Sequence, residues 1–307
     1  MKVYRGLKDE SLHRRPRVLA IGIFDGVHRG HQMILKKAVS AARKLKVPAM
    51  VVTFDPHPQK VLAPHLAAPK IVMSLAHRLR LFATLGITET LIIPFDRRLA
   101  TLERETFLMR ILIGHLGMTA LSVGDDFRFG RGAKGDGAYL SQESKQKDFA
   151  LYLSKPVRHA RRVVSSTEVR RLIEKGRLST AATLLGRPVS LYGDVVHGRG
   201  RGQKKVGFAT ANLNPHHETL PPPGVYAAYG FLNERRFKSV VHIGARPTFG
   251  DREKSVEAHF LNYHGSLYGR EVELLFLGRL RGIRRFASQE ALARQIRRDI
   301  LQAEQLF

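Results

Sequence analysis

The sequence His-Arg-Gly-His at 28–31 places two imidazoles, a guanidinium and a glycine within four residues. Imidazole and guanidinium groups donate hydrogen bonds to phosphate, and Gly30 has no Cβ, so a phosphate group can approach its backbone closely. The segment therefore suits a phosphorylated ligand. The alternative is an ordinary turn with two solvated histidines, and a four-residue pattern does not decide between them.

The surrounding residues predict a strand before this segment and a helix after it. The apolar run from Val18 to Phe24 is typical of a buried parallel strand, and it ends at the turn residues Asp25-Gly26. Apolar residues then recur on one helical face, namely Ile34, Ala38, Ala41 and Leu45. The histidines would thus lie beside a helix N-terminus, where free N–H groups and the macrodipole favour an anion.

The longer segment GIFDGVHRGH (22–31) resembles the nucleotidyltransferase signature of the bifunctional riboflavin kinase/FMN adenylyltransferases, the bacterial FAD synthetase family. The other segments that follow in that family's order are TFDPHPQKVL (53–62), VGDDFRFGRGAKGD (123–136), VVSSTEVRRLI (163–173), VGFATANL (206–213), GVYAAY (224–229), IGARPTFG (243–250), VEAHFL (256–261) and LYGREVEL (267–274). The resemblance covers nearly the whole chain. It implies an enzyme that phosphorylates riboflavin to FMN and then adenylylates FMN to FAD, with ATP as co-substrate, pyrophosphate as by-product and Mg²⁺ as metal.

Length and composition bound this expectation. The chain has 307 residues, enough for about two domains, and it has no cysteine, which excludes disulfides, thiolate metal sites and a cysteine nucleophile. No signal sequence opens the chain, and no apolar run approaches the ~20 residues needed to span a bilayer. We therefore expect a cytoplasmic protein that does not contact a membrane. The sequence leaves the oligomeric state open.

The formal net charge of +26 comes from dispersed clusters of arginine and lysine. One interpretation is nucleic-acid binding, a second is attraction of polyanionic small molecules, and a third is a solvated face in a basic proteome. The dispersion and the lack of a recognisable nucleic-acid module favour the second or third, so no nucleic-acid partner is expected. Binding to random duplex DNA that weakens steeply with salt would indicate the first.

From Val18 to about Leu185, predicted strands and helices alternate, which indicates an α/β fold with a parallel, Rossmann-like sheet. Further strands are predicted over 49–54, 90–93 and 119–123, and helices over 74–85 and 104–116. Ligands of such sheets bind beyond the C-terminal strand ends, where His28, His57 and Asp125 lie. The resemblance makes residues 1–186 the FMN adenylyltransferase domain.

Within this domain, the resemblance assigns residues to two ligands. His28 and His31 would donate hydrogen bonds to the ATP phosphates as catalytic residues. The other residues implied to bind ATP are Gly22, Phe24, Asp25, Gly30, Ser166, Thr167 and Arg170. The residues implied to bind the flavin are His57, Pro58, Asp126, Phe127 and Phe129. By composition alone, 124–138 predicts a mobile surface loop, whereas the family similarity favours a loop that contacts the flavin.

A further helix is predicted to open at Ser165-Ser166-Thr167-Glu168. Hydroxyl residues before a helix are ordinary N-caps, which is a sufficient explanation by spacing. Arg170 and Arg171 follow within the first turn, however, where positive charge opposes the helix dipole. A bound anion would relieve that conflict, and the resemblance identifies it as the phosphates of ATP.

After Arg187-Pro188 the pattern changes to short β-rich segments separated by glycine and proline turns, which predicts a closed antiparallel barrel. The predicted strands are 190–197, 225–231, 237–243, 256–262 and 271–277. A final helix over 288–305 would pack on the barrel through one face, formed by Leu292, Ile296, Ile300 and Ala303. The resemblance makes residues 187–307 the riboflavin kinase domain.

The resemblance also assigns a kinase site in this half. Glu257 matches the family's catalytic glutamate, which would take the proton of the ribityl hydroxyl. Thr210 and Asn212 match residues that bind metal and nucleotide. Gly198, Gly202 and Gly207 lie in a basic segment implied to wrap the ATP phosphates. Residue types alone would make Glu257 an outward-facing strand residue and the basic segment an ordinary turn.

Two residues in this half depart from the family pattern. Ala209 replaces the usual proline, which removes a fixed φ before Thr210 and predicts a slower kinase. His242 replaces the usual asparagine, with no effect that the sequence predicts. These departures motivate one alternative, a monofunctional FMN adenylyltransferase with a weak flavin-binding barrel. Two further alternatives are a nucleotidyltransferase with another acceptor and a basic nucleic-acid-binding protein on an inherited fold.

Overall fold

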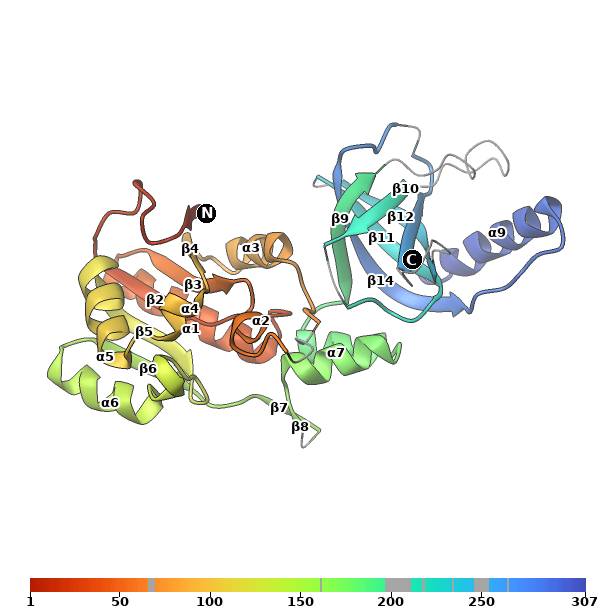
Figure 1. Ribbon diagram of the computed structural model, residues 1–307. Helices are drawn as coiled ribbons and strands as arrows, with labels where there is room; N and C mark the ends of the chain where they lie inside the picture. Colours follow the sequence, from red (N-terminus) through yellow and green to blue (C-terminus); the bar gives the residue numbers. More distant parts are fainter. Residues whose placement is uncertain are drawn as a thin grey trace. The chain divides into compact units, whose positions relative to one another are not determined.

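The computed structural model describes residues 1–65, 70–160, 162–196, 211–216, 219–233, 235–245, 254–263 and 265–307. The chain forms two compact units (Figure 1). Unit 1 comprises residues 1–70 and 75–165, and unit 2 comprises residues 71–74 and 166–307. The expected domain boundary at 186–187 stays a prediction.

Unit 1 is built on a six-stranded parallel sheet with the order β1-β4-β3-β2-β5-β6, which confirms the predicted Rossmann-like architecture. Its strands are β1 (Lys2–Arg5), β2 (Arg17–Ile21), β3 (Ala49–Asp55), β4 (Glu89–Pro94), β5 (Met118–Gly124) and β6 (Ala150–Ser154). A short antiparallel pair, β7 (Arg158–His159) and β8 (Arg162–Val163), follows. Every residue of β2 is buried, as expected for a central strand covered on both faces.

Helices cover both faces of this sheet. Alternate strand residues such as Leu19 and Val52 pack in one core with Phe107 of η1, while Ser122 on the other face donates to the carbonyl of Ile34 in α1 at 2.9 Å. The helices of unit 1 are α1 (Arg29–Leu45), α2 (Pro58–Leu62), α3 (Leu75–Thr84), α4 (Arg97–Ala100), α5 (Arg104–Thr106), the π-helix η1 (Phe107–His115), the 3₁₀ turn η2 (Arg131–Ala133) and α6 (Gly137–Gln146).

Two helices of unit 1 differ in detail from the prediction. The helix expected over 104–116 is the short α5 followed by η1, whose hydrogen bonds follow the wider π pattern. Leu45 was expected on the buried face of α1 but is 50% exposed, because it lies in the last turn, next to the C-cap Lys46. The buried face of α1 is formed by Leu35, Ala38, Val39, Ala41 and Ala42.

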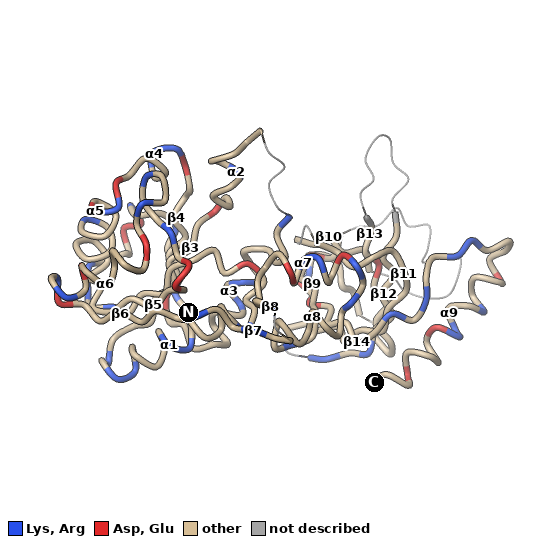
Figure 2. Tube along the Cα trace, turned by 90° about the horizontal axis from the view of Figure 1, so that it is seen from below, with Lys and Arg blue, Asp and Glu red and all other residues tan. Residues whose placement is uncertain are grey.

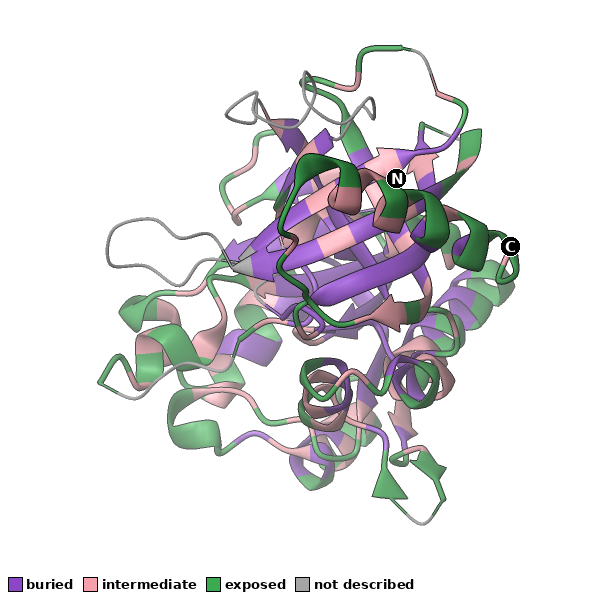
Figure 3. Cartoon of the chain, turned by 90° about the vertical axis from the view of Figure 1, so that its right-hand side faces the viewer, coloured by how far each residue is buried: buried purple, intermediate pink, exposed green. Residues whose placement is uncertain are grey.

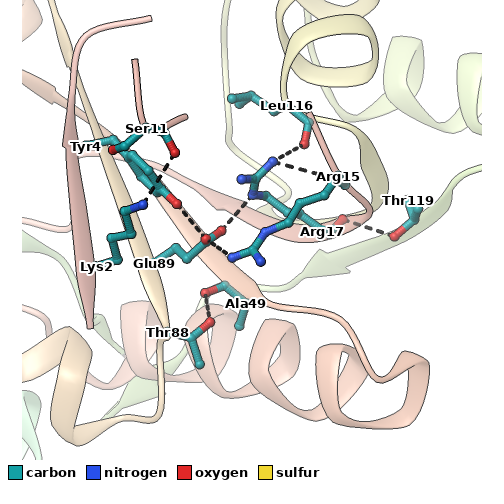
Figure 4. Close-up of polar contacts among 10 residues, drawn as sticks. All are labelled: Lys2, Tyr4, Ser11, Arg15, Arg17, Ala49, Thr88, Glu89, Leu116 and Thr119. Carbon is teal, nitrogen blue, oxygen red and sulfur yellow. Dashed lines mark hydrogen bonds and ion pairs between the residues drawn. The ribbon is translucent and has the colours of Figure 1, made fainter. Parts of the chain in front are cut away.

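A buried polar network lies at the N-terminal edge of the sheet (Figure 4). Glu89 is 2% exposed and accepts hydrogen bonds from Arg17 Nε at 2.6 Å, from the Tyr4 hydroxyl at 2.8 Å and from Arg15. Arg17 also donates to the carbonyl of Leu116 at 2.8 Å. Burial raises the pKa of Glu89, but the hydrogen bonds from Arg17, Arg15 and Tyr4 outweigh it and hold the pKa below its usual value.

Unit 2 contains a closed antiparallel barrel with the strand order β10-β13-β12-β11-β14-β9, which confirms the predicted barrel. Its elements are α7 (Ser166–Glu174), α8 (Leu178–Leu185), β9 (Ser190–Val196), β10 (Ala211–Pro215), β11 (Gly224–Leu232), β12 (Arg235–Ala245), β13 (Lys254–Phe260), β14 (Glu271–Arg281) and α9 (Gln289–Glu304). Strand β10 was not predicted separately.

Helix α9 lies across the barrel with its outer face exposed, while the strands beneath it are largely buried (Figure 3). Ser288 caps the helix, since its hydroxyl accepts a hydrogen bond from the backbone of Ala291 at 3.2 Å. Ala303 is buried, as predicted, and Asp299 is buried beside it in an ion pair with Arg281 at 2.7 Å. Among the described residues, no helix is both long and apolar enough to cross a membrane.

Candidate active sites

The turn between β2 and α1 carries both histidines of the 28–31 segment and has an unusual backbone. Phe24 and Val27 have φ values of +53° and +41°, a left-handed conformation that bulky and β-branched residues rarely adopt. His28 is the N-cap of α1, and its Nδ1 accepts a hydrogen bond from the backbone N–H of His31 at 3.4 Å. A Cβ on Gly30 would lie 3.2 Å from the His28 ring, so the glycine gives that ring its space. The histidines therefore lie at a helix N-terminus, as the sequence predicts.

The two imidazole rings stack on each other, with their centroids 3.6 Å apart and an interplanar angle of 20°. Phe24 packs edge-on against His31 at 5.3 Å. Burial, together with the charges of His28 and Arg78, lowers the pKa of His31 well below its usual value. At neutral pH, His31 is therefore an uncharged imidazole that offers a hydrogen bond to a ligand rather than a full positive charge.

Phe24 and Asp25, two of the residues predicted to bind ATP, lie inside the turn. They are 2% and 4% exposed, so their side chains support the turn from within. Gly22 lies at the start of the turn, and a Cβ there would come within 3.1 Å of the Phe24 ring. Contact of these residues with ATP stays a prediction.

A cavity of about 390 Å³ lies beyond the C-terminal ends of the parallel strands in unit 1. Its walls come from the segments that follow four neighbouring strands, and they are mostly aromatic and aliphatic. Lining residues include Gly22 and Ile23 after β2, Phe54 of β3, Phe95 after β4, and Phe127 and Phe129 after β5. This volume and these apolar walls suit a flat aromatic ligand. The turn at 22–31 thus borders the cavity at one end and caps α1 at the other.

Three of the residues predicted to bind flavin line this cavity, and two do not. Pro58, Phe127 and Phe129 line it, and the two phenylalanine rings stack on each other at 5.4 Å. His57 instead caps α2, where its Nδ1 accepts a backbone hydrogen bond at 3.2 Å. Asp126 is exposed beside the cavity wall rather than part of it.

The cavity wall after β5 is more regular than a loop of its composition suggests. Phe129 and Gly135 exchange two backbone hydrogen bonds of 3.0 and 2.9 Å, which close the segment into a small antiparallel bridge. A Cβ on Gly135 would lie 2.6 Å from the Phe129 ring, so the ring occupies the space that the glycine leaves. The ring also contacts Phe107 of η1 at 5.7 Å. The phenylalanine that lines the cavity is therefore fixed from both sides.

Ser166, Thr167 and Arg170 lie at the start of α7 and belong to unit 2. Arg171 next to them forms a bidentate ion pair with Glu168, with distances of 2.6 and 2.8 Å. Glu168 thus compensates part of the positive charge for which the sequence suggested a bound anion. The role of these three residues in ATP binding stays a prediction.

In unit 2, three polar residues of the kinase half lie in register across adjacent strands. Asn212 of β10 is directly opposite Glu257 of β13, and Glu257 is directly opposite His242 of β12. Directly opposed residues share a face, with Cβ atoms ~4.5–5.5 Å apart. Their neighbours Val256 and Ala258 are fully buried, so the polar row is on the face opposite the barrel core.

Strand pairing therefore brings Asn212 and Glu257 together and adds His242 to them. The pKa of His242 is lowered, because burial and the charge of Arg281 outweigh the opposite effect of the Glu257 carboxylate. Outside the described residues lie the other positions assigned to the kinase site, namely Gly198, Gly202, Gly207 and Thr210, together with the departure Ala209. Their assignments stay predictions.

The described residues contain no group of three or more histidine, cysteine, aspartate or glutamate side chains that would hold a metal ion. Lysine and arginine are spread along both units rather than gathered on one element (Figure 2). The dispersion expected from the sequence is therefore also seen in the fold.

Arg78 is a residue of the first site that the sequence analysis did not single out. It is 4% exposed, and its guanidinium donates to the carbonyl of Ile23 at the start of the turn. Arginines on helices are usually exposed, so the residue type alone does not predict that Arg78 is buried. The available signal was helical spacing, because Arg78 precedes the buried Phe82 by four residues and shares its face.

Comparison with known families divides the chain in two. A family model described as FAD synthetase matches residues 10–168, and one described as riboflavin kinase matches residues 185–307. The first match contains the turn at 22–31 and the cavity, and the second contains the row of Asn212, Glu257 and His242.

Relatives of known name match over the full length. A bifunctional riboflavin kinase/FMN adenylyltransferase from Escherichia coli strain K12 is 37% identical over 100% of this chain and 98% of its own. Proteins of the same name from Pseudomonas fluorescens and Bacillus subtilis are 36% and 29% identical, and cover 100% and 94% of this chain, respectively. A crystal structure described as a macrolide-efflux protein from Streptococcus pneumoniae has a TM-score of 0.84 and 27% identity, with 99% of each chain covered.

Proposed function

The chain belongs to the family of bifunctional riboflavin kinase/FMN adenylyltransferases and has both activities, and from this premise we propose how its residues divide the work. Its substrates and products are riboflavin, ATP, FMN and FAD. FAD formation is assigned to the N-terminal domain and FMN formation to the C-terminal domain with the barrel. For domain bounds we retain 1–186 and 187–307.

In FAD formation, the FMN phosphate attacks the α-phosphorus of ATP and pyrophosphate leaves. His28 and His31 donate hydrogen bonds to the phosphates of ATP from the N-terminus of α1. The isoalloxazine ring enters the cavity beside Phe127 and Phe129. Ser166, Thr167 and Arg170 hold the departing pyrophosphate, and Asp126 orients the flavin or ribose from the cavity edge. Such a transfer depends on positioning and charge stabilisation more than on covalent help.

The observation that supports this assignment best is the continuity of turn and cavity. One ten-residue segment, 22–31, contributes Gly22 and Ile23 to the aromatic cavity and His28 and His31 to the helix N-terminus. A flavin phosphate leaving the cavity along this segment would meet the phosphates of ATP at the histidines. The two substrates of FAD formation therefore have adjacent places in unit 1.

In FMN formation, Glu257 takes the proton of the ribityl 5′-hydroxyl as that oxygen attacks the γ-phosphorus of ATP and ADP leaves. Asn212 and Thr210 hold Mg²⁺ and the nucleotide. The amide oxygen of Asn212 is a hard donor of the kind that Mg²⁺ prefers, and Mg²⁺ at such sites takes most of its ligands from water and substrate phosphates. The lack of a larger metal cluster among the described residues is compatible with that chemistry. When bound, Mg²⁺ supplies charge neutralisation at the phosphates.

The test of this division is a pair of variants assayed for both reactions. We expect His31→Ala to lower FAD formation from FMN about 100-fold, because one donor to the phosphates is lost. FMN formation from riboflavin should be unchanged in the same preparation. Glu257→Ala should lower FMN formation about 100-fold or more, because the general base is lost, and leave FAD formation intact. Chromatographic separation of the flavins over time gives both rates.

The matched control for Glu257→Ala is Glu271→Ala, which removes an exposed carboxylate from another barrel strand. It should leave both rates unchanged. Equal loss of both activities in either test variant contradicts the division of labour between the two units. Full FAD formation by His31→Ala contradicts the role of the turn at 22–31.

For the surroundings of the enzyme, we retain the expectations of a cytoplasmic location and of small-molecule partners without nucleic acid. The second expectation rests on the spread of lysine and arginine along both units in the part of the chain that the structure describes. The expectation of a cytoplasmic location agrees with ATP and free flavins as substrates.

A further inference from the structure

Arg78 of α3 lies buried beneath the turn at 22–31, with 4% of its surface exposed. Its guanidinium donates to the backbone carbonyl of Ile23 and, at 3.4 Å, to the hydroxyl of Thr53. The Thr53 hydroxyl donates to the same carbonyl at 3.4 Å. The carbonyl at which the turn begins is therefore held by side chains from two neighbouring elements.

The backbone after this carbonyl is the strained part of the turn, with positive φ at Phe24 and Val27. The Phe24 ring packs edge-on against Phe82 at 5.8 Å, and Phe82 lies one helical turn beyond Arg78 on the same face of α3. Helix α3 thus holds the turn at two consecutive points, one polar and one aromatic. Strained conformations persist where the surroundings enforce them, and these contacts supply such support.

Two carboxylates balance the buried guanidinium. Asp25, within the turn and 4% exposed, and Asp55, at the end of β3, both raise the pKa of Arg78 against the lowering effect of burial. The Nε of Arg78 nevertheless has no hydrogen-bond partner among the described residues, and an unpaired buried N–H is destabilising. Replacing a whole buried ion pair by apolar residues is often neutral or stabilising, so buried charges are weak evidence for a role in stability. The contacts of Arg78 therefore favour a role in placing the turn over a role in stability alone.

We propose that Arg78 is a positioning residue for FMN adenylylation, which holds the turn so that His28 and His31 meet the ATP phosphates in a fixed geometry. The inference rests on the proposed role of this turn in FAD formation. The charge of Arg78 also reaches His31, whose pKa is lowered by burial and by the charges of His28 and Arg78. Arg78 thus adds to the effect of burial, which keeps His31 uncharged, and also holds the turn in place.

The first experiment compares both activities in three variants of the full chain. Arg78→Gln should lower FAD formation about 10- to 100-fold, since small misplacements of catalytic groups cost that much. FMN formation should stay within about two-fold of wild type, which shows that unit 2 is intact, and urea titrations followed by circular dichroism control for the folding of unit 1. Arg78→Lys keeps the charge but not the planar fork, and should recover part of the rate. Arg80→Gln, at an exposed arginine on another face of α3, should leave both rates unchanged.

A second measurement does not depend on activity. Titration of the His31 imidazole by NMR, assigned from the spectrum of His31→Ala, should show a higher pKa in Arg78→Gln than in wild type. The pKa in Arg78→Lys should remain near the wild-type value, because the positive charge is kept. If Arg78 had only a structural role, the pKa of His31 would not differ between Arg78→Gln and Arg78→Lys.

The inference is overturned if Arg78→Gln keeps full FAD formation, loses both activities equally, or leaves the pKa of His31 unchanged. Failure of the proposed function has a different signature, because His31→Ala itself would then retain FAD formation. The NMR titration still decides in that case whether Arg78 sets the charge of His31.

Discussion

His242 lies directly opposite Glu257 on the adjacent barrel strand, and its ring occupies the space above Gly244. A Cβ on that glycine would come within 2.7 Å of the ring, so the glycine makes room for the larger side chain. Arg281 also acts on the imidazole from β14, and Val225, opposite His242 on β11, is apolar. The charge of His242 is therefore felt by the carboxylate that we assign as the base of the kinase.

This arrangement predicts a pH dependence of FMN formation. Burial lowers the pKa of His242 more than Glu257 raises it, so the imidazole is neutral at pH 7 and gains a proton only in acid. A cation beside Glu257 weakens the carboxylate as a base. We expect the kcat/KM of wild type to fall more steeply below pH 6 than that of His242→Asn, with the two within about three-fold at pH 7.5. Superimposable profiles would refute the coupling, and circular dichroism of both proteins at each pH controls for unfolding of the barrel.

At the scale of single residues, the sequence predicted the histidines of the turn and the two phenylalanines of the cavity. It did not predict Arg78 or the significance of His242. The histidines belong to a contiguous motif, which local spacing reveals. Arg78 contacts Ile23, 55 positions away, and His242 lies opposite Glu257, 15 positions away. Only tertiary packing and strand register bring these pairs together.

At the scale of elements, the segment after β5 joins the flavin cavity to η1 through Phe129. Gly135→Ala should push that ring away, because the new Cβ would lie 2.6 Å from it. We expect the KM for FMN in FAD formation to rise about 10-fold, since the ring is part of the cavity wall, while the KM for riboflavin in the kinase reaction is unchanged. Steady-state kinetics of both reactions measure this.

Lys134→Ala is the matched control for Gly135→Ala, since it changes the exposed neighbouring side chain and leaves the bridge intact. It should keep the wild-type KM for FMN. A wild-type KM in Gly135→Ala would show that Phe129 does not contact the flavin.

The elements found from sequence were those with long apolar runs or strong helical periodicity. Strands β1, β6 and β10 were missed, and each is only four or five residues long. In β10, Ala211 and Leu213 alternate with asparagines, which is a strand pattern too short to stand out from the basic segment before it. The strand that carries Asn212 was therefore hidden by its brevity.

At the scale of the molecule, the buried polar network and the proposed active site lie at opposite ends of the strands of the parallel sheet. The Glu89 network ties β1 to the N-terminal ends of β2 and β4, whereas the turn and the cavity lie beyond the C-terminal ends of the strands. Glu89→Gln should lower the free energy of unfolding of unit 1 by about 3 kcal/mol at pH 7, because Arg17 stays buried without its carboxylate. Urea titrations that follow FAD and FMN formation separately report the two units.

The same network predicts the pH range of this effect. The folded pKa of Glu89 is below its reference value of 4.5, so its stabilisation is complete above that pH and is lost as the pH falls through the folded pKa. The difference between wild type and Glu89→Gln should therefore shrink towards pH 3. Glu105→Gln, at an exposed ion pair with Arg104, should change stability little at any pH. A constant difference across this range would contradict the assignment to Glu89.

The four residues 71–74 belong to unit 2, although unit 1 flanks them on both sides in the chain. The carbonyl of Ile71 accepts two hydrogen bonds from Thr219, at 3.1 and 2.9 Å, and Met73 contacts Arg187 at 3.4 Å. In genetic terms, a single break in the coding sequence cannot give two fragments that each contain one complete unit. A fragment that starts after residue 165 lacks a piece that its own unit uses, and the other fragment carries that piece without its contacts. Splitting this gene into two enzymes would require the short segment to be replaced as well.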